Sequence, residues 1–278
     1  MHRFAFLSSL ILSVALAGCQ TTKRPAPAPD TTIKTSSIVA QQGSQIAETE
    51  GRLPQMSHDT RPHHLAGRTL TVASIHDLHL HDKEVILSFD DGPIPGRTDR
   101  VLATLDQFGV KGAFMMVGEL AELHPELARK VAMEGNAIGS HTYRHDNLAT
   151  LAFDMAMNEI TRGAAAVTNA TGVDVNFFRF PYLADSHKLR AAVAMRDMVV
   201  MDVDVDSKDY LNTSPAAISK RTMDLLHRRG RGIILMHDIH NRTATMLPTL
   251  LSTLEAEGYK VVTVQFEKPT APAEMASL

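Results

Sequence analysis

Seven short apolar runs divide the chain between residues 85 and 264. They span residues 85–89, 112–117, 136–139, 176–180, 198–205, 232–236 and 260–264. Amphipathic stretches with helical spacing lie between most of them, at residues 98–109, 125–135, 154–167, 216–230 and 246–258. A glycine follows or closes most of these stretches, as a left-handed helix C-cap requires. Strands that alternate with helices form parallel sheets, so the pattern predicts an α/β fold, either a barrel or a doubly wound sheet.

Five polar segments follow these runs. They are "FDD" (89–91), "SHTYRH" (140–145), "FRFPY" (178–182), "DVDSKDY" (204–210) and "LMHD" (235–238). In both architectures the carboxyl ends of the strands meet at one functional edge. A single strand-end Asp is usually a turn or a helix cap, and a single His is usually a satisfied core residue. Five such segments at one edge therefore predict a functional site.

The third segment has the spacing of a metal site. His141 and His145 are four residues apart, which places them on one face of a helical turn and lets both imidazoles bind one ion. Asp91, at the end of the first strand, would complete a two-His, one-carboxylate site with open positions. The alternative is an exposed helix start that carries two His by chance.

Composition limits the other classes of function. A chain of 278 residues with 44% hydrophobic residues can hold one sizeable domain plus appendages. The net charge of −3 gives no electrostatic argument for nucleic-acid binding. Fourteen His residues are more than a core needs and agree with metal or proton chemistry.

The N-terminal segment has the features of an export signal. Arg3 precedes an apolar stretch, and "LAGC" at residues 16–19 resembles a bacterial lipobox, with Cys19 as the lipidated residue. Cys19 is the only Cys, so the chain forms no internal disulfide. We expect a signal peptide at residues 1–18, a lipidated Cys and flexible tether at 19–66 and a folded domain at 67–278. The alternative is an ordinary signal peptide that contains a Cys.

Residues 67–84 precede the regular pattern. They alternate enough to predict a lead-in strand or a hairpin. His76, His79 and His81 fall in this segment, and their spacing fits the exposed side of an extended chain as well as it fits a metal site. We interpret them as structural or incidental.

Five motifs in order carry a resemblance to a known family. "SFDDGP", "HTYRH", "RFPY", "DSKDY" and "LMH" resemble the motifs of the polysaccharide deacetylases of carbohydrate esterase family 4, which include the nodulation-factor chitooligosaccharide deacetylases. The resemblance covers roughly residues 84–266. It implies a distorted (β/α) barrel of about seven parallel strand-helix units, in agreement with the seven apolar runs.

The resemblance implies separate roles for the adjacent acids. Asp91, with His141 and His145, matches the metal ligands, and the metal is Zn²⁺ or else Co²⁺, Ni²⁺ or Mn²⁺. Asp90 matches the general base that takes a proton from the attacking water. Arg179 matches the Arg that holds the base ionised and oriented.

The other motifs imply the remaining roles. His237 matches the general acid that protonates the departing amine, and either Asp206 or Asp209 would orient it. The backbone N–H of Tyr182 would stabilise the oxyanion. We assign Tyr182, Tyr210 and Leu235 to the substrate and oxyanion side of the site.

Three features depart from the family pattern. Tyr210 occupies the position of the usual Trp, in a chain that has no Trp. "RFPYL" replaces the commoner "RPPYG", so that Leu183 would reshape the floor of the cleft. The fourth motif is crowded with acids, and its period of two predicts that Asp202, Asp204 and Asp206 share one face.

Together these features predict a lipid-anchored, metal-dependent N-deacetylase of the bacterial envelope, on the periplasmic side of the outer membrane. Peptidoglycan is the first expected substrate, because it is the polymer nearest to such an anchor. Chitooligosaccharide, poly-N-acetylglucosamine and O-acetylated polysaccharide are the alternatives within the family. The alternative of a different class is a non-catalytic glycan-binding lipoprotein.

Overall fold

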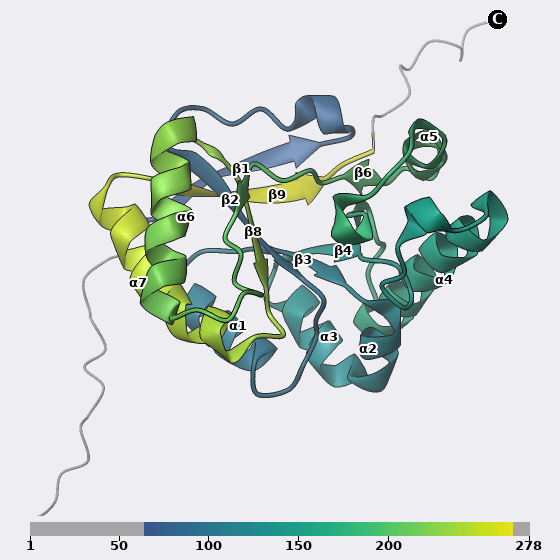
Figure 1. The fold of residues 1–278 in the computed structure, drawn as a ribbon, viewed down its shortest axis with the longest axis horizontal. Helices are drawn as coiled ribbons and strands as arrows, with labels where there is room; N and C mark the ends of the chain where they lie inside the picture. The colour runs from purple at the N-terminus through teal and green to yellow at the C-terminus, as the bar shows by residue number, and fades with distance from the viewer. Residues whose placement is uncertain (1–63, 269–278) are drawn as a thin grey trace, which may run out of the picture. The chain divides into compact units, whose positions relative to one another are not determined.

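The computed structural model describes residues 64–268 of the chain (Figure 1). The strands in this range are β1 (Ala66–Val72), β2 (Glu84–Asp90), β3 (Ala113–Met116), β4 (Ala137–Ser140), β5 (Phe177–Phe178), β6 (Val199–Val200), β7 (Val205–Asp206), β8 (Gly232–His237) and β9 (Lys260–Phe266). The α-helices are α1 (Thr98–Gln107), α2 (Gly118–Leu123), α3 (Pro125–Met133), α4 (Phe153–Thr171), α5 (His187–Ala194), α6 (Pro215–Arg229) and α7 (Asn241–Ala256). Three 3-10 turns are η1 (Ile75–Asp77), η2 (Leu148–Thr150) and η3 (Pro181–Leu183). No helix in residues 64–268 is both long and apolar enough to span a bilayer.

The sheet is parallel and is centred on β2. β8 pairs with Val85–Asp90 of β2, whereas β9 pairs with the first residues of β2 and β3 pairs with its last residues. The ladder continues through β4, β5 and β6 on one side and to β7 beyond β8 on the other. The described residues show no ladder between β6 and β7, which residues 201–204 connect directly. This arrangement confirms the parallel α/β prediction and agrees with a distorted barrel.

The two faces of the sheet bury different sets of side chains. Along β2, Val85, Leu87 and Phe89 pack in a large cluster that also contains the apolar faces of α1, α3, α4, α6 and α7. Ile86 belongs to a second cluster, whose buried members come from strands and the adjoining Met201, with no helix contribution. Because a sheet face without helices must be covered by the sheet itself, this second cluster is the inside of the barrel. Figure 1 shows the helices on the outside.

The predicted helices and their glycine ends are confirmed. All five predicted stretches are helical in the structure. Gly172 and Gly230 are the C-caps of α4 and α6, with φ of 78° and 80°. A residue with a Cβ is strained at such angles, which explains why the chain uses glycine where these helices end.

The pattern missed or merged several elements. The run 198–205 is two strands, because β6 pairs with β5 whereas β7 pairs with β8, and the chain crosses the barrel seam between them. The helices α2 and α5 were not predicted. α2 has six residues, too few to show a helical period, and α5 contains mainly small or polar residues.

The segment before β2 is a lead-in strand and not a hairpin. β1 runs parallel to β9, and the fully buried Leu65 accepts a hydrogen bond from the backbone N–H of Val261. His76, His79 and His81 are exposed in the segment that follows. The predicted signal peptide and the tether up to residue 63 lie outside the described residues.

Candidate functional site

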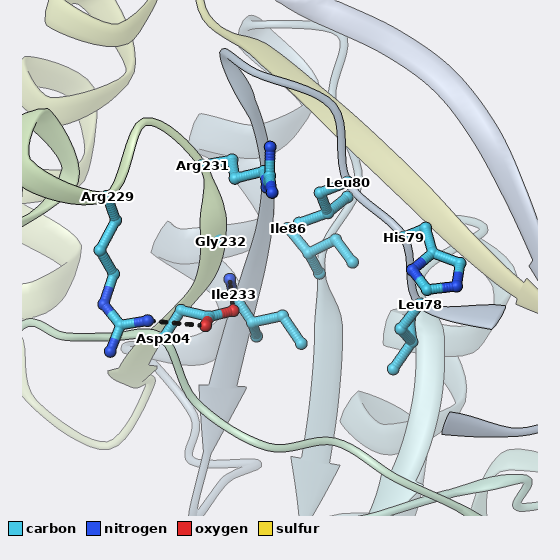
Figure 2. A pocket seen from close by; sticks show the side chains of 9 residues that line it. All are labelled: Leu78, His79, Leu80, Ile86, Asp204, Arg229, Arg231, Gly232 and Ile233. Carbon is cyan, nitrogen blue, oxygen red and sulfur yellow. Dashed lines mark hydrogen bonds and ion pairs between the residues drawn. The ribbon is translucent and has the colours of Figure 1, made fainter. Parts of the chain in front are cut away.

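Two cavities lie at opposite ends of the barrel strands. The first, of about 360 Å³, is at the amino ends of β2 and β8; Figure 2 shows Arg229 paired with Asp204 on one wall and His79 on the other. The second, of about 520 Å³, is at the carboxyl ends. Its lining contains residues from all five motifs: Asp90, Asp91, His141, His145, Phe180, Tyr182, Leu183, Asp206, Tyr210, Leu235 and His237. The carboxyl-end cavity is therefore the candidate site, at the edge that the sequence predicted.

Asp90 is the last residue of β2 and points into the barrel. Strand alternation places Ser88 and Asp90 on the inner face, and both side chains are almost completely buried. The Nη1 atom of Arg179 lies 2.6 Å from Asp90 Oδ1 and 2.9 Å from Ser88 Oγ, and Arg179 Nε donates to the carbonyl of Met201. A buried ion pair loses hydration, and further hydrogen bonds are needed to offset that cost. Here Ser88 and Met201 also accept hydrogen bonds from Arg179. The arrangement fixes the Asp90 carboxylate.

Asp91 turns the chain out of the strand. Its φ of 75° lies in the left-handed region, and its carboxylate faces the two His residues of the third motif. Asp91 Oδ1 lies 3.6 Å from His141 Nε2 and 3.3 Å from His145 Nε2. One ligand atom from each of the three residues lies within 4.8 Å of the others. The structure therefore brings the predicted ligand set together.

The prediction that His141 and His145 lie on a helical turn is wrong. They flank a loop in which Thr142 and His145 have positive φ angles of 68° and 63°. The carbonyls of Thr142 and Tyr143 accept hydrogen bonds from Gly118 and Glu119 in the first turn of α2. The left-handed angles exclude a local helix, and the loop instead caps α2 and brings the two His residues to the cavity by another route.

The donor atoms suit a divalent metal ion. His141 Nδ1 lies 2.8 Å from the carbonyl of Arg179, so Nδ1 carries the proton and Nε2 presents a lone pair to the cavity. Burial lowers the pKa of His141 despite the nearby Asp90 and Asp91, and the ring is neutral as a ligand requires. Asp91 Oδ1 is buried without a hydrogen-bond partner. A buried, unpartnered carboxylate oxygen beside two imidazoles fits such an ion.

His237, which lines the same cavity, pairs with the fully buried Asp209. His237 Nδ1 lies 2.7 Å from Asp209 Oδ1, and Asp209 Oδ2 accepts from the His237 backbone N–H and from Thr243 Oγ1. Burial opposes the charged form of His237, but Asp209, together with the charges of Asp90 and Asp91, raises its pKa to about 9. Although burial opposes its charge, the bond to His237 holds the pKa of Asp209 below its ordinary value. Of the two predicted partners, the structure places Asp209 at His237.

The three alternating acids do not share a face, which corrects that prediction. Asp202 pairs with Arg190 of α5, and Asp204 accepts from Arg229 and from the backbone of Ile233 at the other end of the barrel. Asp206 accepts from the hydroxyl of Tyr210 at 3.0 Å. They diverge because residues 201–204 cross the barrel seam and do not form a strand.

Two tyrosines flank the cavity. Tyr182 is 67% exposed and its ring packs edge-on against His145, at 4.8 Å between centroids. Tyr210 is 46% exposed and packs edge-on against His237, at 5.5 Å. Leu183 and the buried Leu235 complete apolar parts of the wall. One aromatic side chain therefore stands beside the metal ligands and the other beside the His237–Asp209 pair.

Known proteins match this chain over its motifs. A family model described as polysaccharide deacetylase matches residues 78–200. The peptidoglycan-N-acetylglucosamine deacetylase PgdA of Listeria monocytogenes is 31% identical over 183 residues, which make up 66% of this chain and 38% of the relative. The structure of the Bdellovibrio bacteriovorus peptidoglycan deacetylase Bd3279 superimposes on this chain with a TM-score of 0.67 and 31% sequence identity. The superposition covers 74% of this chain and 61% of the Bdellovibrio chain. A chitin deacetylase of Colletotrichum lindemuthianum is 30% identical over 192 residues, which make up 65% of this chain and 77% of the relative. The chain belongs to the polysaccharide deacetylase family.

The chain thus spans well under two thirds of the Listeria relative and somewhat under two thirds of the Bdellovibrio structure. The family model ends at residue 200, so Asp209 and His237 lie beyond the matched range. Their contact is a finding of the structure, and it adds the fourth and fifth motifs to the site.

Several side chains at the candidate site were missed from the sequence. Ser88 accepts a hydrogen bond from Arg179, Thr243 donates one to Asp209, and Phe180 lines the cavity. Asp238 and Thr98 form a buried contact directly behind the site. Asp238 stands in the "LMHD" segment, which marks it as a strand-end acid, but no pattern in the sequence indicates its partner.

Proposed function

We propose that this chain is a divalent-metal-dependent hydrolase that removes N-acetyl groups from a glycan containing N-acetylhexosamine. The observation that carries the proposal is the arrangement of three functional sets around one cavity. The ligand set lies at one side, the Arg179-held Asp90 lies beside it, and the Asp209-held His237 faces Asp90 from the neighbouring strand. Amide hydrolysis needs these three parts, because water must be activated, the oxyanion stabilised and the amine protonated.

Each part has a separate task in the proposed reaction. Asp91, His141 and His145 would hold Zn²⁺, or else Co²⁺, Ni²⁺ or Mn²⁺, which when bound activates water and polarises the amide carbonyl. Asp90 accepts the proton of the attacking water, with Arg179 fixing the orientation of its carboxylate. The backbone N–H of Tyr182 is the protein donor that we assign to the oxyanion.

His237 supplies the proton for the departing amine. Its Nδ1 is bound to Asp209, so Nε2 is the atom left to face the cavity. A pKa of about 9 keeps the imidazole protonated at neutral pH, as a general acid requires at the start of the reaction. Asp90 and His237 are register partners on adjacent strands, so the base and the acid flank the same point in the cavity.

We propose peptidoglycan as the first substrate. The support comes from the two relatives whose names state peptidoglycan deacetylation, and from exposed tyrosine faces that can stack on sugar rings. Chitooligosaccharide, poly-N-acetylglucosamine and O-acetylated polysaccharide stay as alternatives, and the chitin deacetylase relative favours the first of these.

The placement of the protein in the cell is a separate proposal. The "LAGC" sequence supports lipidation at Cys19, with the catalytic domain held by its tether on the periplasmic face of the bacterial outer membrane. Residues 1–63, which carry this signal, lie outside the part of the chain that the structure describes.

A non-catalytic glycan-binding lipoprotein is the alternative of a different class. A binding protein can use the tyrosines and the cavity, but it gains nothing from a carboxylate paired with a buried Arg179 or from a buried His237–Asp209 pair. Both pairs cost desolvation free energy, which a catalytic role explains and a binding role does not.

The test uses the purified chain loaded with Zn²⁺ and four polymers: peptidoglycan, chitooligosaccharide, poly-N-acetylglucosamine and acetylated xylan. We expect acetate release with equal formation of free amine, largest on peptidoglycan. Joint replacement of His141 and His145 by Ala should remove both bound metal and activity, whereas joint replacement of the exposed His79 and His81 should change neither. A chain that binds one Zn²⁺ and the polymers but releases no acetate from any of them supports the binding lipoprotein instead.

A further inference from the structure

A buried acid lies directly behind the proposed metal site. Asp238 follows the last residue of β8 and is 1% exposed. Its Oδ2 accepts a 2.5 Å hydrogen bond from the hydroxyl of Thr98, and its Oδ1 accepts from the backbone N–H of Gly92 at 3.1 Å. Thr98 begins α1, and Gly92 directly follows Asp91, so this one carboxyl joins three segments.

Strand register explains the position of Asp238. Asp90 and His237 are paired across β2 and β8, and both point into the barrel. The next residues on the two strands, Asp91 and Asp238, would by alternation both point outward, with two like charges side by side. The positive φ of Asp91 separates them, because it turns the Asp91 carboxylate into the cavity while Asp238 stays outside.

The turn at Asp91 needs external support. A left-handed backbone is unfavourable for a residue with a Cβ and persists where surrounding contacts determine it. The Gly92 carbonyl accepts from the N–H of Val117, and its N–H donates to Asp238. A Cβ on Gly92 would lie against the Asp238 carboxylate inside van der Waals contact, so the carboxyl can take this position only because residue 92 is a glycine.

Thr98 completes the same support. Its Oγ1 donates to Asp238 and accepts from the N–H of Ile94, which ties the loop after Asp91 to the start of α1. Burial raises the pKa of Asp238 to about 7. A hydroxyl can donate to the carboxylate or accept from the neutral acid, so the contact is available to both forms.

We propose that Asp238, together with Thr98, is a positioning residue that holds Gly92 and thereby keeps the Asp91 carboxylate turned toward His141 and His145. The inference rests on the metal site of the proposed function. It assigns to Asp238 an effect on metal affinity, although its own side chain faces away from the ligands.

The experiment measures the affinity of the substrate-free chain for Zn²⁺ by competition with a chromogenic chelator. Asp238→Asn and Thr98→Val should each lower the affinity by roughly 10- to 100-fold, as loss of a group that orients a ligand does. Thr98→Ser keeps the hydroxyl and should restore an affinity close to that of the unsubstituted chain. Thr98→Val removes no ionisable side chain, whereas Asp238→Asn does, so an effect common to both variants points to the contact that they share.

Thr222→Val is the matched control. Thr222 is also fully buried and also donates its hydroxyl to one acceptor, the Ile218 carbonyl, but it lies in α6 away from the cavity. The Thr222→Val variant should lower the urea midpoint of unfolding as Thr98→Val does and leave Zn²⁺ affinity unchanged.

The inference is overturned if Thr98→Val leaves Zn²⁺ affinity unchanged, or if Thr98→Ser lowers it as much as Thr98→Val does. A chain that binds no Zn²⁺ at all overturns both the inference and the metal site. If Zn²⁺ binds tightly and its affinity changes as expected in the variants, but the chain releases no acetate, the proposed function is refuted and the positioning role of Asp238 is not.

Discussion

The His237–Asp209 pair gives a prediction about stability in the metal-free chain. Folding raises the pKa of His237 from its ordinary value of 6.5 to about 9, chiefly because Asp209 outweighs the effect of burial. At roughly 1.4 kcal/mol per pKa unit, this shift corresponds to about 3 kcal/mol of folding stability. The His237 side chain is 13% exposed, so solvent screens only a small part of the interaction.

The sign follows from proton binding. The folded chain holds the His237 proton more tightly than the unfolded chain does, so protonation stabilises the fold. The contribution is complete below pH 6.5 and is lost as the pH rises to about 9. Asp209→Asn removes the charge that raises this pKa, so most of the fall in unfolding free energy between these pH values should disappear.

The assay is urea unfolding in the presence of a chelator, measured at several pH values across this window. Glu257→Gln is the matched control, because it breaks another His–carboxylate pair, in which His227 Nε2 lies 2.5 Å from Glu257 Oε2 with the imidazole 47% exposed. Exposed pairs contribute little, so this control should keep the slope of the unsubstituted chain. An Asp209→Asn chain with the same slope as the unsubstituted chain would refute the assigned coupling.

Three further predictions test the proposed roles. Asp90→Asn should retain bound Zn²⁺ and lose activity by roughly 10²- to 10⁴-fold, whereas Asp91→Asn should lose Zn²⁺ affinity and regain part of its turnover when Zn²⁺ or Co²⁺ is added in excess; metal content and acetate release decide between them. His237→Ala should keep its metal and lose less activity on an activated ester than on an N-acetyl sugar, because a good leaving group needs no proton; equal losses on both substrates would exclude His237 as the acid. Cys19→Ser should move the protein from the membrane fraction to the soluble periplasmic fraction, and persistent membrane association would exclude lipidation as the anchor.

The sequence predicted the parts of the fold that have a regular period. The strands with four or more residues from position 84 onward and the five long helices follow from short apolar runs, helical spacing and glycine ends. The short elements β5, β6, β7 and α2 carry too few residues for a period to be read, and the ends of the three strands depend on which neighbouring strand they pair with. The barrel seam at residues 201–204 is such a tertiary effect.

The sequence predicted which residues form the site better than it predicted how they are arranged in space. The ligand set Asp91, His141 and His145 is brought together as expected, but by a loop that caps α2 and not by a helical turn. Spacing alone could not distinguish Asp206 from Asp209 as the partner of His237, because the choice depends on where the chain after β7 lies against β8. The support from Asp238 depends on contacts between segments about 140 residues apart, which no local pattern reports.

The proposed chemistry depends on the register of two strands. Asp90 and His237 share the inner face because Ile86 and Ile233, also register partners, fill the barrel interior below them. A slip of one residue would turn either Asp90 or His237 to the outer face, where helices pack. The apolar side chains inside the barrel resist that slip, because it would also move an isoleucine out of its buried position. The inner core therefore does more than stabilise the fold: it fixes which strand-end side chains can meet in the cavity, and the loops then adjust only the residues that follow.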